Sequence, residues 1–477
     1  MDPQKDDLRP ALERVHRFSL DHQESLGEHR AATNPHPKGP LPLPATGGGA
    51  LAAIDELLSR YGSEFSGSPG PRYWGFVNGG VTPAALAGDW LSSAIDQNSQ
   101  LNGDGAAAFI EHEALGMLRD LFGLPDAFHG VFVTGGTMAN YVGLGIALQR
   151  LGARRGVDVS QSGVSALGPV RIVTGASHSS IAKSAAMLGI GRESVVEVPQ
   201  LDGREAVDPQ AMERVLQEHS EAGASQVIVA NAGTVLTGDF DDIEALAGLS
   251  ERFGAHLHVD AAFGAFAACS KEHRQLVAGM ARADTVASDG HKFLNVPFDS
   301  GFLFARSLGD QVELFQNISS YQSPPRLDPK HYIHLSPQNS RRLRALPAWI
   351  SLRAYGAEGQ AAIVERCCAL AAELGRRIEA SESFRLLAPV RYCVVCFQLL
   401  VAGRPADETE TRDFLDRVRD DGRVFVTPGN LRGTPCVRLA MVNWRTTEAD
   451  LEIAMDAFRD CSGASNKASD RAREVTR

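Results

Sequence analysis

The chain has 477 residues, of which 43% are hydrophobic and 22% charged, and its formal net charge is −11 at pH 7. This length exceeds one ordinary hydrophobic core, so two or three domains are expected in a soluble globular protein. The acidic balance argues against nucleic acid or an anionic membrane as the main partner. No apolar run reaches the roughly 18 residues of a membrane helix, and the charged N-terminus lacks a signal core, so we expect a cytoplasmic protein.

The first 78 residues predict an N-terminal segment with two helices, and a Pro/Gly-rich run over 34–49 separates the helices at 8–29 and 51–61. The Pro/Gly-rich run is either an extended arm that lies on a partner subunit or a flexible terminus. Aromatic residues then gather around Phe76 in a Gly/Pro loop, where they either line a site or close the edge of a core.

Between residues 79 and 345, apolar strands alternate with helices, which predicts a large α/β domain with a mostly parallel seven-stranded sheet covered on both faces. Ligands of such sheets bind where the carboxyl ends of the strands meet the loops. The predicted strands cover residues 130–134, 170–175, 194–199, 226–233, 255–264, 283–288 and 301–306.

From residue 346 to 462 the pattern changes to a smaller α+β domain. A long helix over 360–381 precedes short strands, and the polar stretch 463–477 predicts a disordered tail. The predicted strands of this domain are 391–401, 423–427 and 436–443.

The seven cysteines are few and scattered, which fits free thiols better than a disulfide framework. Cys393 and Cys396 form one C-x-x-C pair within a predicted strand, where residues three apart point to opposite faces. We therefore expect no metal site.

The loops after the first two predicted strands carry the first candidate site residues. Gly136 and Thr137 open a helix, and its N-terminal N–H groups favour a phosphate, although a strand-to-helix turn also needs small residues. His178 lies in a loop of small residues, where it either caps the next helix or presents its ring to a flat ligand.

Two further candidates follow later strands. Asp260 precedes small and apolar residues, so its carboxylate either caps a helix or is buried and needs a cation or several donors. Ala262 leaves room for a planar group. Lys292 lies among small and neutral residues, so it either reaches the surface or is held for its amine, and we expect no acid beside it.

These four functions match the needs of pyridoxal 5′-phosphate (PLP). The cofactor needs an anion site for its phosphate and a stacking partner for its ring. It also needs a carboxylate for its pyridine nitrogen and an amine for a Schiff base.

The segments GVFVTGGTMAN, GASHSS, HVDAAFG and DGHKFLNVPFDSG resemble the group II PLP-dependent decarboxylases, which include the aromatic-amino-acid and glutamate decarboxylases. The resemblance runs from about residue 69 to 458 and includes SRRLRALPAW and VRLAMVNWRTT. It implies the aminotransferase-like fold (fold type I) and a homodimer with active sites at the subunit interface. The N-terminal segment would then pack on the partner subunit.

Carried over residue by residue, the resemblance makes Lys292 the imine (internal aldimine) lysine and pairs Asp260 with the pyridine nitrogen. It stacks His178 on one face of the ring and sets Ala262 against the other.

The same resemblance assigns the phosphate to Gly136 and Thr137, with help from His291. It implies that Arg438 binds the carboxylate of the substrate. The alternative for Arg438 is an ordinary ion pair at the protein surface. The mobile-loop tyrosine that protonates the product would be Tyr332, or else Tyr321.

We therefore expect a decarboxylase that converts an L-amino acid to an amine and CO₂. The aromatic and small residues around Phe76 and Phe298 mildly favour an aromatic or apolar substrate side chain. The alternatives are another PLP-dependent lyase, an aldehyde-forming enzyme or an aminotransferase, and the sequence leaves the identity of the substrate open.

Overall fold

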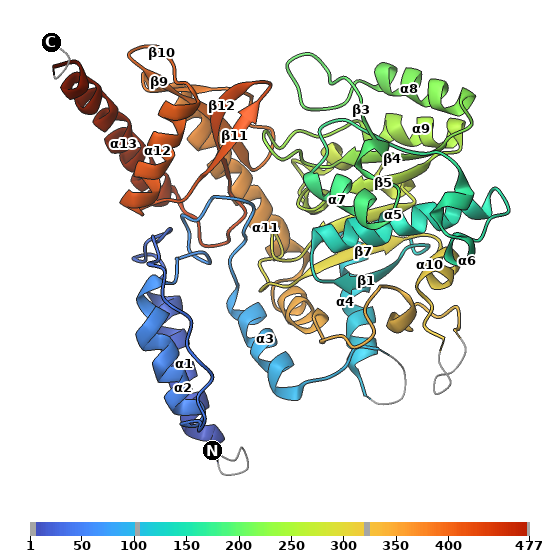
Figure 1. Cartoon of the computed structure of the whole chain (residues 1–477), viewed down its shortest axis with the longest axis horizontal. Coiled ribbons are helices and arrows are strands. Elements are labelled where there is room, and N and C mark those ends of the chain that lie inside the picture. The colour runs from blue at the N-terminus through green and yellow to red at the C-terminus, as the bar shows by residue number, and fades with distance from the viewer. Residues whose placement is uncertain (1–5, 101–104, 319–324, 475–477) are drawn as a thin grey trace.

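The computed structural model describes residues 6–100, 105–318 and 325–474 (Figure 1). Its large domain is built on a seven-stranded sheet with the order β1-β7-β6-β5-β4-β2-β3. The prediction of a mostly parallel sheet is confirmed, since β2 to β6 pair in parallel. The strands are β1 (His129–Val133), β2 (Val170–Thr174), β3 (Val195–Glu197), β4 (Ser225–Asn231), β5 (His256–Asp260), β6 (Thr285–Asp289) and β7 (Gly301–Ala305).

Strand β7 is antiparallel to both of its neighbours, β6 and β1. The reason is the connection over residues 290–300, which contains no crossover helix, so the chain reverses directly after β6. Every residue of β4, β5, β6 and β7 is buried, so both faces of the sheet are covered. The helices of this domain are α4 (Ala107–Leu121), α5 (Gly136–Ala153), α6 (Val159–Ser162), α7 (Ser179–Met187), α8 (Pro209–Glu221), α9 (Ile243–Phe253) and α10 (Leu308–Phe315).

The small domain contains a five-stranded antiparallel sheet with the order β10-β9-β12-β11, and β8 pairs with β9. The strand predicted at 423–427 is displaced to β11, because Phe425 instead bridges to Tyr73. Strands β8 and β10 are too short to produce a recognisable period. The strands are β8 (Phe384–Leu386), β9 (Val394–Val401), β10 (Arg404–Pro405), β11 (Thr427–Leu431) and β12 (Thr434–Ala440).

The long helix α11 (Ala345–Glu379) packs against α3 (Pro83–Ile95) and α4 at one end and against the small-domain sheet at the other. Its backbone leaves the helical conformation at Gly356, with φ 62°. The other helices of the small domain are α12 (Glu408–Asp421) and α13 (Glu448–Glu474). Helix α13 runs to Glu474 and so includes most of the stretch 463–477, for which a disordered tail remains the prediction; residues 475–477 lie outside the described residues.

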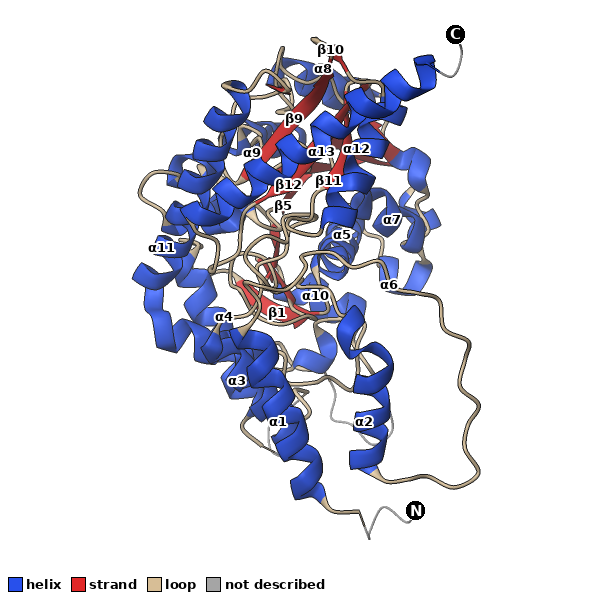
Figure 2. Ribbon diagram, turned by 90° about the vertical axis from the view of Figure 1, so that its left-hand side faces the viewer, coloured by secondary structure: helices blue, strands red, loops and turns tan. Residues whose placement is uncertain are grey.

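The N-terminal helices α1 (Leu8–Glu24) and α2 (Ala50–Tyr61) pack on each other and extend away from the rest of the molecule (Figures 1 and 2). The Pro/Gly-rich run between them is a long loop without helix or strand. The segment is joined to the small domain by Arg30, whose guanidinium donates to the Asp420 carbonyl at 2.6 Å. No helix in the described ranges is long and apolar enough to cross a membrane.

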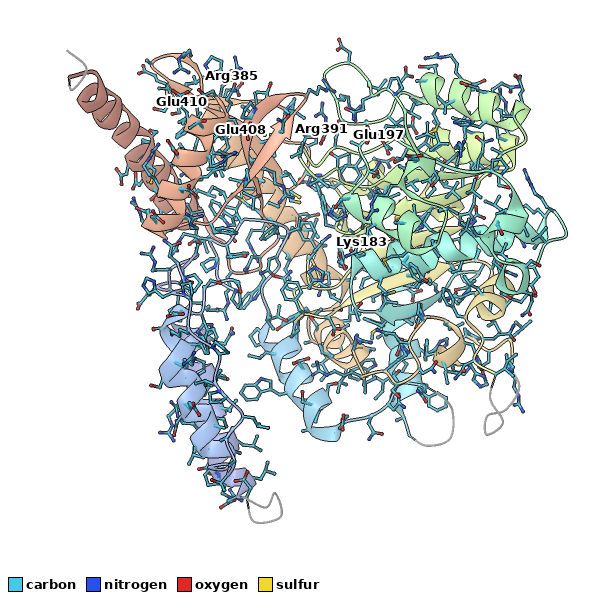
Figure 3. The ribbon with its side chains drawn as sticks, viewed as in Figure 1. Lys183, Glu197, Arg385, Arg391, Glu408 and Glu410 are labelled. Atoms are coloured by element: carbon cyan, nitrogen blue, oxygen red, sulfur yellow. The ribbon has the colours of Figure 1, made fainter. Side chains whose placement is uncertain are left out.

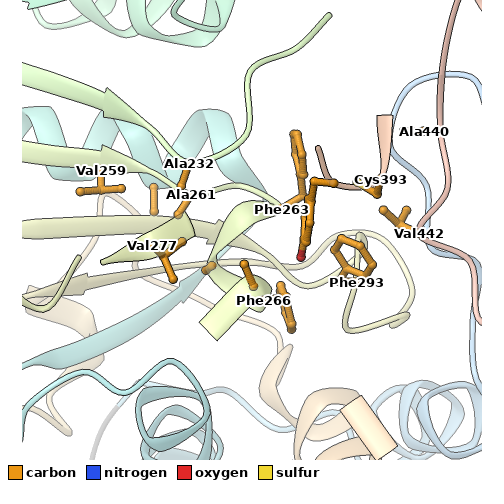
Figure 4. Packing of buried hydrophobic residues seen from close by; sticks show 14 of the residues in the cluster. Ala232, Val259, Ala261, Phe263, Phe266, Val277, Phe293, Cys393, Ala440 and Val442 are labelled. Carbon is orange, nitrogen blue, oxygen red and sulfur yellow. The ribbon is translucent and has the colours of Figure 1, made fainter. Parts of the chain in front are cut away.

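The main hydrophobic core is continuous from the large sheet into the small domain (Figure 4). Phe263 and Phe293 of the large domain meet Tyr392, with the Phe293 and Tyr392 ring centroids 5.4 Å apart. Because Phe293 follows Lys292 directly and is fully buried, this packing anchors the segment that carries the lysine.

Candidate active site

A cavity of about 1520 Å³ opens at the carboxyl ends of the strands of the large domain, beside the small domain. It is lined by every predicted site residue except Tyr332, although these residues come from six separate segments of the chain. The predicted residues that line it are Phe76, Gly136, Thr137, His178, Asp260, Ala262, His291, Lys292 and Arg438.

One end of the cavity is the N-terminus of α5. Gly135 is its N-cap and supplies no side-chain hydrogen bond, so the first N–H groups of this 18-residue helix remain available to a ligand. A Cβ atom on Gly136 would lie 2.5 Å from Asp289 Oδ2, so the glycine keeps this corner open. The uncapped helix end and the bare glycine fit a phosphate group.

Asp260 ends β5 and is 6% exposed. Its Oδ2 accepts a hydrogen bond from Asn140 Nδ2 at 2.8 Å, and its Oδ1 accepts one from the Ala262 N–H at 3.2 Å. Within the described ranges, no lysine or arginine forms an ion pair with this carboxylate. Neutral donors therefore orient Asp260 and leave its charge available to a protonated ring nitrogen.

His178 is the N-cap of α7, since its Nδ1 accepts a hydrogen bond from the Ser180 N–H at 3.2 Å. Burial lowers the pKa of His178; the negative charge of Asp260 opposes this, and the positive charge of Lys292 adds to it. The ring is therefore neutral near pH 7. Capping and ring stacking were alternatives in the sequence, but one histidine can do both because its ring also lines the cavity.

Lys292 lies in the connection between β6 and β7, and its Nζ lies 2.9 Å from Asp289 Oδ2. The expectation that no acid lies beside this lysine is therefore wrong. Asp289 ends β6, which directs its side chain into the same corner, and it is almost fully buried. An acid three residues before a lysine at a strand end is the signal that could have revealed the pair.

His291 lies beside the same ion pair. Its Nδ1–H donates to the Ser300 carbonyl at 3.0 Å, and its ring centroid lies 4.5 Å from that of Phe298. Phe298 is 63% exposed and Phe76 is 64% exposed, so two large apolar rings stand at the wall of the cavity in a single chain.

Arg438 reaches the cavity from β12 and is only 4% exposed. Its Nε donates to the Val235 carbonyl at 2.8 Å, and its Nη1 donates to the Phe76 carbonyl. Burial lowers the pKa of Arg438 to about 10. In the described part of the chain it has no carboxylate ion-pair partner, so a buried cation faces the cavity with carbonyl partners alone.

The assignment of Tyr332 to a mobile loop is wrong. Tyr332 lies in a short 3-10 helix and is fully buried. The Cζ atom of Arg341 lies 5.3 Å from the centroid of the Tyr332 ring. Tyr332 does not line the cavity, because its ring contributes to the hydrophobic core. The second candidate, Tyr321, lies outside the described residues.

Sequence reasoning also overlooked Asn140 and Ser180, two buried residues on α5 and α7 that contact the site residues Asp260 and His178. Asn140 follows Gly136 by one helical turn and therefore faces the same side of α5. That spacing could have identified it.

The fold is that of the fold type I PLP enzymes. The structure of rice TDC with PLP and tryptamine superposes with a TM-score of 0.88, covering 98% of this chain and 99% of the rice chain at 22% identity. The structure of mouse CSAD superposes with a TM-score of 0.86, covering 97% of this chain and 99% of the mouse chain at 24% identity.

Residues 66–400 match the family model described as the pyridoxal-dependent decarboxylase conserved domain, and the chain belongs to this family. Mouse cysteine sulfinic acid decarboxylase is 32% identical over 340 residues, which cover 69% of this chain and 66% of the relative. Bovine acidic amino acid decarboxylase GADL1 is 30% identical over 69% of this chain and 63% of its own length. The aromatic-L-amino-acid decarboxylase of Bacillus atrophaeus is 25% identical over 81% of this chain and 80% of its own length. The chain thus spans about two thirds of the length of the mammalian relatives.

Proposed function

We propose that this chain is a PLP-dependent decarboxylase that removes the α-carboxylate of an L-amino acid to give an amine and CO₂. The observation that carries the proposal is Arg438. This buried cation shares a cavity with Lys292 and has no carboxylate partner in the described ranges. Burying a charge without a counter-ion is costly, so an anionic substrate group would relieve that cost on binding.

The residues of the cavity fit the cofactor. The α5 N-terminus would hold the phosphate, His178 and Ala262 would lie against the ring, and Asp260 would pair with the ring nitrogen. Lys292 would provide the amine for covalent attachment. When bound, PLP supplies an electron sink for the pair of electrons that CO₂ leaves on the α-carbon.

The protein's own residues bind and orient the substrate. Arg438 would hold the carboxylate in a poorly solvated setting, where a charged group loses water that otherwise stabilises it. Asp289 Oδ2 lies 2.9 Å from Lys292 Nζ and would accept a hydrogen bond from it. The exposed rings of Phe76 and Phe298 line the cavity and would exclude water from a bound substrate.

For the side chain of the substrate we propose an aromatic or apolar group. The support is the wall of the cavity, where Tyr73, Phe76, Phe298 and Phe425 supply aromatic surface for such a group.

A second candidate is an acidic side chain. It is favoured by the names of the relatives at 30–33% identity, which are cysteine sulfinic acid decarboxylase and acidic amino acid decarboxylase. For this candidate the cavity offers Arg412 and Arg419 on α12 as cations, each of which forms an ion pair with an acid of the same helix.

The test is CO₂ release by the PLP-loaded protein from a panel of L-phenylalanine, L-tyrosine, L-tryptophan, L-glutamate, L-aspartate and L-cysteine sulfinate. Faster turnover of the aromatic members supports the first substrate class, and faster turnover of the acidic members supports the second. An aldehyde product, or a requirement for a keto-acid acceptor, would instead support the aldehyde-forming or aminotransferase alternatives. No CO₂ from any member would overturn the decarboxylase proposal.

We also propose a homodimer in which the N-terminal helices pack on the partner subunit. The support is a stripe of exposed apolar residues on α1, where Leu8, Leu12 and Val15 are 71%, 57% and 38% exposed. These positions share one face of the helix and lack a covering layer in the single chain. Sedimentation should give twice the chain mass for the natural protein and the chain mass for Leu12→Glu. A natural protein with the chain mass would contradict the proposal.

A further inference from the structure

A buried hydrogen-bond network lies beneath the cavity and meets at one amide, that of Asn140. The amide nitrogen donates to Asp260 Oδ2 at 2.8 Å and to Ser180 Oγ at 2.9 Å, and the amide oxygen is 2.9 Å from His258 Nε2. Both N–H donors and the carbonyl oxygen of the amide therefore have a partner, and Asn140 is 1% exposed.

The direction of each hydrogen bond follows from Asp260. A carboxylate only accepts, so the amide nitrogen of Asn140 must face it and the amide oxygen must face His258. His258 Nε2 therefore carries the proton. Burial lowers the pKa of His258 to about 3, so its Nδ1 is unprotonated and accepts from the Thr285 hydroxyl at 2.9 Å.

The second branch of the network fixes the tautomer of His178. Ser180 Oγ accepts from Asn140, so its own proton is directed to His178 Nδ1 at 2.7 Å. The Ser180 N–H points to the same Nδ1 at 3.2 Å. Two donors face Nδ1, so the proton of the neutral ring must be on Nε2, the nitrogen left to face the cavity.

The helix is built to accommodate this network. A Cβ atom at Gly143, one turn after Asn140, would lie 2.6 Å from His258 Cε1 and 2.7 Å from its Nδ1. Only a residue without a side chain leaves room for the imidazole beside α5. His258 and Thr285 are both fully buried, so no water competes for these hydrogen bonds.

We propose that Asn140 is a positioning residue that orients Asp260 and, through Ser180, holds His178 as the Nε2–H tautomer. The same amide thereby contacts Asp260, which would pair with the ring nitrogen of the cofactor, and sets the tautomer of His178, which would lie against the cofactor ring. The cavity receives a hydrogen-bond donor from His178 rather than an acceptor. The use of that donor by a substrate or cofactor rests on the proposed function, whereas the tautomer itself does not.

The test is nitrogen NMR of the full-length, PLP-loaded protein labelled with ¹⁵N-histidine, in which His178 is assigned by its loss in His178→Gln. The natural protein should show a protonated Nε2 and an unprotonated Nδ1. Asn140→Asp turns the Ser180 proton toward the new carboxylate and should shift the ring proton toward Nδ1. Ser180→Ala removes the shorter of the two hydrogen bonds to Nδ1 but keeps the backbone N–H, so it should raise the fraction of the Nδ1–H form without making that form dominant. Ser180→Thr keeps the hydroxyl and should keep the natural pattern.

Ser184→Ala is the matched control, because Ser184 is also buried on α7 and its hydroxyl has no hydrogen-bond partner among the described residues. It should leave the His178 signals unchanged. If Asn140→Asp does not fold, the Ser180 variants still decide the outcome. A natural protein with the proton on Nδ1, or a fraction of the Nδ1–H form that does not rise at all in Ser180→Ala, would overturn the proposal. Because the readout is the ring proton, the result does not depend on whether the chain releases CO₂.

Discussion

Lys292 Nζ lies 2.9 Å from Asp289 Oδ2, and a Cβ atom on Gly136 would lie 2.5 Å from the same oxygen. The carboxylate thus contacts the proposed covalent lysine and also borders the proposed phosphate site. Its negative charge stabilises the ammonium but opposes an anion at the α5 N-terminus. Asp289 therefore has opposite electrostatic effects on the lysine and on a phosphate.

Asp289→Asn should tighten the binding of PLP, because the substitution removes the negative charge beside the phosphate site and releases Lys292 from its ion pair. We expect roughly a tenfold lower Kd, equivalent to about 1.4 kcal/mol, from absorbance titrations of the PLP-free protein. Asp208→Asn, at the N-cap of α8, is the control and should leave the Kd unchanged. Weaker binding in Asp289→Asn would mean that the carboxylate positions the cofactor.

Lys292→Ala should abolish both the visible absorbance of covalently bound PLP and the release of CO₂, because it removes the proposed attachment point. The control is Lys183→Ala, since Lys183 is an exposed lysine on α7 (Figure 3). That variant should keep both properties. If Lys292→Ala retained the absorbance, another lysine would have to hold the cofactor.

Arg438→Lys should raise KM by roughly 10- to 100-fold, because a charged hydrogen bond contributes about 1.5–3 kcal/mol and lysine cannot reproduce the planar guanidinium. Steady-state CO₂ release measures the change. Arg385→Lys tests the same substitution at an exposed position on β8 and should have no effect (Figure 3). An unchanged KM in Arg438→Lys would remove Arg438 from substrate binding.

Tyr332→Phe should leave product and turnover unchanged, because the ring is buried away from the cavity. Its hydroxyl is also buried and has no hydrogen-bond partner among the described residues, so its removal should be neutral or slightly stabilising. Product analysis and thermal unfolding check both parts. Aldehyde in place of amine from this variant would restore Tyr332 to the mechanism.

The protein should lose stability as the pH falls below 6.5. Burial lowers the pKa of His129 to about 4 and that of His258 to about 3, from an ordinary value of 6.5. Both rings stay neutral in the folded state while the unfolded chain takes up protons, so their contribution is present above pH 6.5 and declines toward pH 4. Each group should reduce the free energy of unfolding by about 1.4 kcal/mol per pH unit in that window.

Urea unfolding between pH 7 and pH 5 measures this slope. His129→Gln should reduce the slope of unfolding free energy against pH by the contribution of one histidine. The same substitution at the exposed His36 should leave the slope unchanged. If His129→Gln had the same slope as the natural protein, the lowered pKa of His129 could not be a source of the pH dependence.

The sequence by itself determined the α/β class and most of the cavity. Apolar strands alternating with helices indicate a covered, mostly parallel sheet, and the carboxyl ends of such strands meet at one edge. For this reason Thr137, His178, Asp260 and Lys292 could be expected to meet although 155 residues separate the first from the last. Local chemistry also sufficed for the α5 N-terminus, because two glycines before a helix suit an anion.

Only the tertiary structure decided which neighbours each of these residues has. Asn140, Ser180 and His258 carry no unusual local pattern, and their link arises because α5, α7 and β5 pack together. The same holds for Tyr332, whose polar surroundings in the sequence resemble a surface loop but whose ring completes the core. The partner of Lys292 is likewise set by where β6 ends. The periodicity of the strands determines which face of the sheet a residue lies on and at which edge of the sheet the strands end. The distances between side chains on different elements depend instead on how these elements pack.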